Sequence, residues 1–90
     1  VGATDSFGVV PSLSSRGPAY DGRLKPELVA LGEDGSSGAA AIVSGITALM
    51  QQAYQQKNNR SIESATTRAI LFNSADDVGT SGPDFISGYG

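Results

Sequence analysis

GSSGAAAIVSG, residues 35–45, places two hydroxyl side chains in a run of very small residues, directly before a long apolar segment. Small residues allow the backbone to turn sharply or to pack closely. A serine at the point where such a turn becomes a helix can present its hydroxyl next to backbone amides that have no intrahelical partner. The stretch therefore fits a nucleophile at Ser37. From Gly-Ser-Ser-Gly alone, however, a capping serine in a glycine-rich turn is the favoured explanation.

The residues after this turn predict a helix over residues 37–54, with Asp34 or Ser36 as its cap. Its apolar positions cover nearly every direction around the axis, which is typical of a helix buried on all sides. These positions are Ala39, Ala40, Ala41, Ile42, Val43, Ile46, Ala48, Leu49 and Met50. A second helix is expected from an N-cap at Ser61 to about Asn73. One apolar stripe at helical spacing supports it, formed by Ile62, Ala65, Ala69 and Phe72.

The remaining segments predict short strands and loops. Residues 1–4 are read as the end of a strand, and residues 27–30 as a short strand that follows Pro26. The Ser-, Gly- and Pro-rich stretch between them is expected to be a loop, with a short extended piece around 9–14. Two short strands and one amphipathic helix are few partners for a helix that is apolar on all sides. The sequence therefore indicates part of a larger α/β domain.

Composition excludes several classes of function. The chain has 90 residues, a formal net charge of −3 and only scattered basic residues, which argues against nucleic-acid binding. The apolar run 38–50 is too short to span a bilayer. The chain has no cysteine, and therefore no disulfide or thiolate metal site, and it has no histidine, the usual general base for a serine nucleophile. Because it begins at Val1 without a methionine or a basic leader, we expect an internal cut.

Two groups of carboxylates are candidates for a cation site or for acid–base chemistry. Glu33 and Asp34 are adjacent in a turn, and Asp76, Asp77 and Asp84 lie in a second glycine-rich region. Calcium takes several oxygen ligands, but the spacing of these residues fits no known calcium loop. Solvated turns are therefore the favoured explanation for both groups.

Four segments, in order, resemble the C-terminal part of the catalytic domain of the subtilisin-like serine proteases (subtilases, peptidase family S8). Residues 1–5 (VGATD) resemble the family's VGA-x-D strand, and residues 13–18 (LSSRGP) resemble its FSSRGP segment. Residues 22–30 (GRLKPELVA) are similar to its GRxKPDxVAPG strand. Residues 73–90 contain NSADD, GPD and GYG, similar to the family's NTADD…GPD…GYG ending.

Residues 35–45 also fall without a gap on the family's nucleophile motif, GTS[MF]A[AS]P-x-V-[AS]-G. Ser37 then takes the place of the nucleophile and Ser36 that of the threonine. The sequence departs from the family at four places. Gly38 replaces a large Met or Phe, Ala41 and Leu31 each replace a proline, and only two residues separate Gly32 from Gly35, where family members usually carry a longer connection.

The resemblance implies a fragment of a three-layer αβα fold with a mostly parallel sheet, with residues 1–90 as the C-terminal segment of one catalytic domain. It implies a serine endopeptidase with an Asp-His-Ser triad acting on protein or peptide substrates. Ser37 would be the nucleophile and, through its backbone N–H, an oxyanion donor beside an Asn side chain, with Ser36 as a secondary donor. The Asp, His and Asn would lie in a partner segment upstream of Val1. The resemblance implies no cofactor in this segment, leaves structural calcium in the parent protein open, and suggests a secreted or cell-envelope location.

Two other functions remain open. A subtilase-like pseudoprotease or binding domain would keep the fold without catalysis, and Gly38, Ala41 and the short connection favour it. A free-standing serine-rich interaction module would explain neither the helix that is apolar on all sides nor the four ordered segments.

Overall fold

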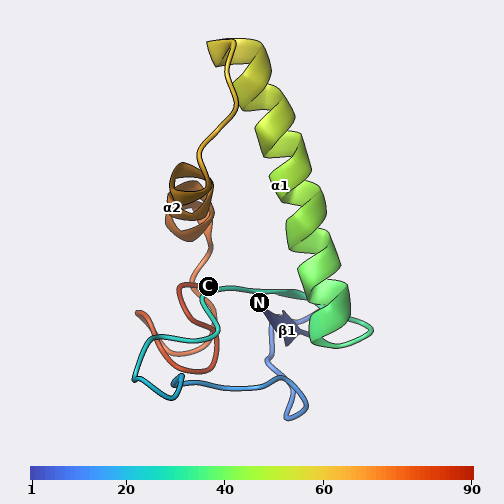
Figure 1. Ribbon diagram of the computed structural model, residues 1–90. Helices are drawn as coiled ribbons and strands as arrows, with labels where there is room; N and C mark the ends of the chain where they lie inside the picture. The colour runs from blue at the N-terminus through green and yellow to red at the C-terminus, as the bar shows by residue number, and fades with distance from the viewer.

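The computed structural model describes residues 1–90 and contains two strands and two helices. The strands β1 (Gly2–Thr4) and β2 (Val29–Leu31) form a two-stranded parallel sheet. The helix α1 (Ser36–Asn58) rises away from this sheet, and α2 (Ser64–Ser74) lies beside α1 (Figure 1). The loops gather at the end of the molecule where the sheet lies. The predicted α/β class with a parallel sheet is confirmed.

The long connection from β1 to β2 is held by side chains that bond to backbone groups. The buried Ser14 hydroxyl accepts a hydrogen bond from the Ala3 N–H at 2.9 Å. The Asp5 carboxylate accepts two more, from backbone N–H groups of the following turn. The expected extended piece at residues 9–14 is wrong. The Ser14 N–H bonds to the Pro11 carbonyl at 3.0 Å and closes a turn there instead.

Strand β2 begins two residues later than predicted because the preceding backbone pairs with the C-terminal segment. The Glu27 carbonyl accepts a hydrogen bond from the Tyr89 N–H at 2.8 Å, and the Val29 N–H donates to the Gly90 carbonyl at 2.8 Å. Residues far apart in the sequence thus hold this end of the strand in place. The Phe72 ring of α2 stacks on the Tyr89 ring, with centroids 5.2 Å apart, and joins the same region to the second helix.

The turn between β2 and α1 brings the backbone very close to β1. The Gly32 N–H donates to the Thr4 carbonyl at 3.0 Å, and the Gly35 N–H donates to the Gly32 carbonyl at 2.8 Å. A Cβ atom at Gly32 would lie 2.3 Å from the Gly35 carbonyl oxygen and 2.7 Å from the Cβ of Ala3. Only glycine fits this position, and α1 therefore starts directly against the sheet.

Helix α1 is longer than predicted and begins without the expected cap. Its N-cap is Gly35, which offers no side-chain hydrogen bond, so the prediction of Asp34 or Ser36 was wrong. Ser36 is already the first helical residue. The helix continues past Tyr54 through two glutamines and a lysine, residues with good helix propensity. It ends where Asn59 takes the left-handed conformation, with φ 59°.

Helix α1 is not buried on all sides by these 90 residues, and its predicted burial within a larger α/β domain stays a prediction. Ala39 is its only buried residue, while Ile42, Ile46 and Leu49 are 42%, 49% and 68% exposed. The sheet and α2 contact the helix on part of its circumference only, which leaves an apolar face open. Neither helix combines the length and apolarity that a membrane crossing requires.

Helix α2 starts three residues after the predicted cap. Its N-cap is Glu63, so the prediction of Ser61 was wrong; the Ser61 hydroxyl instead donates to the Gln55 side-chain oxygen of α1, 3.5 Å away. The one buried residue of α2 is Thr67, whose hydroxyl donates to the Glu63 carbonyl at 3.1 Å. The predicted apolar stripe is not the buried face, since its members Ala65 and Ala69 are exposed.

The C-terminal acidic residues stabilise their own turns. The Asp84 carboxylate accepts hydrogen bonds from the Ser87 N–H at 2.7 Å, the Ile86 N–H at 2.8 Å and the Ser87 hydroxyl at 3.0 Å. The Ser87 and Ile86 backbone bonds, in that order, lower the pKa of Asp84 below its ordinary value. The Asp77 carboxylate similarly accepts from the Gly82 N–H at 2.7 Å.

Replacing Gly32 with alanine should destabilise the fold, because the added Cβ would overlap the Gly35 carbonyl and Ala3. Overpacking of this kind costs about 1–3 kcal/mol of unfolding free energy. Urea unfolding followed by circular dichroism would measure it. The matched control is Gly45→Ala, which meets nothing within 4 Å in the middle of α1 and should gain about 1 kcal/mol in helix propensity. Equal stabilities for the two variants would contradict this account of the turn.

Acidification should remove the stabilisation that Asp84 provides. Its folded-state pKa is lowered, so the contribution is complete above the unfolded-state pKa of about 3.9 and is lost as the pH falls through the lower folded-state value. Asp84→Asn should therefore flatten the pH dependence of the unfolding free energy below about pH 5. Asp76→Asn is the control, because the exposed Asp76 carboxylate accepts no hydrogen bond. The same acid slope in the wild type and the Asp84 variant would rule out this role.

Candidate functional site

Ser37 lies in the first turn of α1, two residues after the N-cap Gly35. Its side chain is exposed and its hydroxyl makes no hydrogen bond to another residue of the chain. The short turn 32–35 places this first turn at the carboxyl ends of β1 and β2, where both parallel strands stop. Loops at this edge of a parallel sheet are a common place for ligands in open α/β folds.

The amides around Ser37 are also free. The first intrahelical bond runs from the Ala39 N–H to the Gly35 carbonyl at 3.2 Å, and the N–H groups of Ser36, Ser37 and Gly38 have no carbonyl partner. Unpaired amides at a helix start carry a partial positive charge and stabilise anions. The predicted oxyanion donor, the Ser37 N–H, is therefore available for a ligand.

The second candidate, Ser36, is adjacent to Ser37 and is also exposed. Neighbouring residues of a helix are separated by about 100° around its axis and do not face each other. The two hydroxyls therefore leave the helix in different directions. The secondary role of Ser36 stays a prediction.

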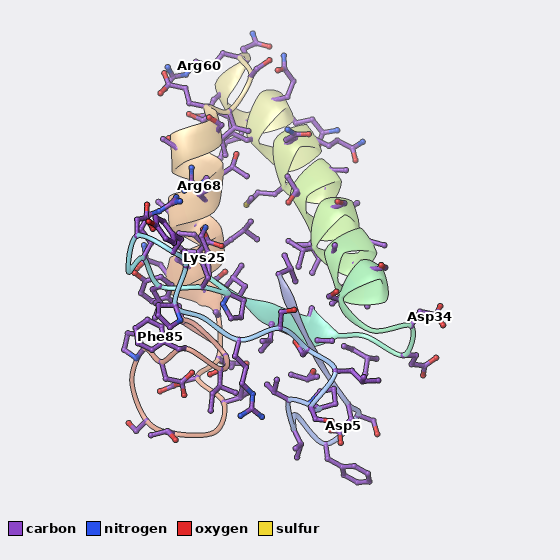
Figure 2. All side chains as sticks on the ribbon, turned by 60° about the horizontal axis from the view of Figure 1, so that its bottom comes forward. Asp5, Lys25, Asp34, Arg60, Arg68 and Phe85 are labelled. Atoms are coloured by element: carbon purple, nitrogen blue, oxygen red, sulfur yellow. The ribbon has the colours of Figure 1, made fainter.

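The acidic residues of the preceding turn stand apart from any other charged group. Glu33 and Asp34 are exposed, and neither forms an ion pair. Asp34 projects outward from the turn at the start of α1, while Asp5 lies on a separate loop (Figure 2). No three His, Cys, Asp or Glu side chains come close enough together to hold a metal ion. The chain contains no histidine to deprotonate Ser37.

Glycine gives this site a geometry that the sequence alone did not reveal. Gly32 is required by its close contact with Ala3, and Gly35 has φ 70° and ψ −155°. Gly38 differs from both. A Cβ there would lie 3.6 Å from the Asp34 Cβ, an ordinary contact, so the turn leaves room for a side chain at the position next to Ser37. The run of glycines signalled a turn, but not which of them is required.

Comparison with known proteins shows the family of this sequence. No solved structure matches the chain. The sequence model of the subtilase family, peptidase family S8, matches residues 1–90, which is the entire chain described above. The chain therefore belongs to the subtilase family, a family of serine peptidases.

Proposed function

We propose that this chain carries the nucleophile segment of a serine endopeptidase, with Ser37 as the nucleophile. The observation that carries the proposal is the exposed, unbonded Ser37 hydroxyl in the first turn of α1, next to its own free N–H. The register of the family motif supports the same residue, because Val43 and Gly45 hold their places after it.

The reaction is acyl transfer followed by hydrolysis. A histidine deprotonates Ser37 Oγ, which attacks the carbonyl carbon of the scissile peptide bond. The Ser37 N–H donates to the oxyanion that forms, together with an Asn side chain, and Ser36 is a secondary donor. The protonated histidine then transfers its proton to the leaving amine, and water releases the acyl group by the same steps. Ser37 and its N–H are the parts that this chain supplies.

We propose that the Asp, His and Asn belong to a segment upstream of Val1 and that residues 1–90 are the C-terminal segment of one catalytic domain. The open apolar face of α1, with Ile42, Ile46 and Leu49, supports this proposal because such a face is stable only when covered. The two-stranded sheet supports the same proposal, since a sheet of only two strands has marginal stability by itself. On the family resemblance we also propose protein or peptide substrates outside the cell or at its envelope.

The alternative is a pseudoprotease that keeps the fold and binds peptides without cleaving them. Gly38, Ala41 and the short turn 32–35 favour it, because they change the immediate surroundings of Ser37. Both proposals predict the same fold. They differ in whether Ser37 reacts when the complete domain is present.

The 90-residue chain alone should not hydrolyse peptides, because it contains no histidine to act as the general base. The measurement is the release of a chromophore from a peptide substrate by the isolated chain. Turnover that disappears in the Ser37→Ala variant would show that a base exists within these 90 residues, and would refute the prediction.

In the presence of the upstream segment, Ser37 should react with a fluorophosphonate, which forms a bond from phosphorus to Ser37 Oγ and loses fluoride. Peptide mapping by mass spectrometry locates the label. Ser37→Ala should abolish labelling, whereas Ser36→Ala should label more slowly but at the same residue. Labelling at Ser36 would contradict the assignment of the nucleophile. A complete, folded domain that never labels would support the pseudoprotease.

A further inference from the structure

We propose that Gly35 is a positioning residue, whose glycine-specific backbone conformation fixes the place of the Ser37 hydroxyl and N–H. This inference rests on the proposed role of Ser37 as the nucleophile. Gly35 touches no reacting atom. It acts through the start of α1, two residues before Ser37.

The conformation of Gly35 lies in a region that is essentially restricted to glycine, with φ 70° and ψ −155°. Crowding within residues 1–90 does not explain the glycine, because a Cβ at this position would meet none of their atoms within 4 Å. This is the opposite of Gly32, whose added Cβ would overlap neighbouring atoms. At Gly35 the requirement is therefore purely one of backbone conformation.

Both peptide groups of Gly35 are engaged in one chain of hydrogen bonds. The Gly32 N–H donates to the Thr4 carbonyl of β1 at 3.0 Å. The Gly35 N–H donates to the Gly32 carbonyl at 2.8 Å, and the Gly35 carbonyl accepts from the Ala39 N–H at 3.2 Å. This chain links the end of β1 to the first turn of α1. The free N–H groups of residues 36–38 lie between its last two members.

The buried alanines on either side of the turn make this link stiff. Ala3 of β1 and Ala39 of α1 are both fully buried, so a shift of the helix start along the sheet would disturb the packing around them. A residue at position 35 that prefers negative φ must either keep a strained backbone or redirect the chain before Ser37. Because a shift of about 1 Å in a reacting group costs up to about a hundredfold in rate, redirection impairs catalysis even if the fold survives.

A D-amino acid separates this conformational role from every other effect of adding a side chain. Its preferred regions mirror those of an L-residue, and the Gly35 conformation mirrors the common extended region near about φ −75° and ψ +145°. L-alanine and D-alanine at position 35 therefore add the same atoms with opposite backbone preferences.

The experiment uses the complete catalytic domain, with residues 1–90 introduced by chemical ligation so that position 35 can carry glycine, L-alanine or D-alanine. The rate of fluorophosphonate labelling at Ser37, kcat and KM are measured, and thermal unfolding reports the fold. Gly35→Ala should lower the labelling rate and kcat by about ten- to a hundredfold with KM little changed. The D-alanine protein should stay within about twofold of the wild type, by the same reasoning.

Two results would overturn the proposal: labelling of Gly35→Ala at the wild-type rate, or a folded D-alanine protein that labels as slowly as the L-alanine protein. If Gly35→Ala does not fold, the comparison of the D-alanine protein with the wild type decides alone. Retained labelling then supports the proposal and lost labelling refutes it. A wild-type domain that does not label at Ser37 would refute the proposed function itself, and this result appears before any substitution is made.

Discussion

The contact between the Gly32 backbone and Ala3 is the constraint on which the rest of the structure depends. Without a side chain at position 32, the chain leaves β2, bonds back to the Thr4 carbonyl and enters α1 within four residues. Ala3 of β1 and Ala39 of α1, on either side of this turn, are both fully buried. A parallel sheet of only two short strands has few interactions of its own, so this close approach decides where the first turn of α1 lies.

The exposure of the Ser37 hydroxyl beside free amides follows from this placement rather than from the serine alone. A serine in the first turn of any helix has free amides nearby. Here the turn is tied to the ends of two parallel strands, so the free amides and the hydroxyl are held at one edge of the sheet. Short-range backbone hydrogen bonds make this tie, with only two residues between Gly32 and Gly35.

Local signals in the sequence predicted the elements, and long-range contacts decided their details. The apolar run after Ser37 identified α1, and the stretch after Pro26 identified β2. The start of β2 depended on Tyr89 and Gly90, which no local pattern connects to it. The predicted cap residues of both helices were also wrong. Ser61 contacts α1 instead of capping α2, and α1 begins at Gly35, which has no side chain to form a cap. The motif located Ser37 as a candidate, but it carried no information on φ and ψ at Gly35.

The way α1 projects from the sheet also has a consequence for its dynamics. The helix has 23 residues and is therefore about 35 Å long, but its only buried residue, Ala39, lies in the first turn. Local opening needs little free energy where few apolar contacts are made. Amide exchange should therefore be slowest near Ala39 and become faster toward Asn58. Within this chain Ser37 lies at the most persistent end of the helix, so fraying or nicking of the far end would leave its surroundings intact.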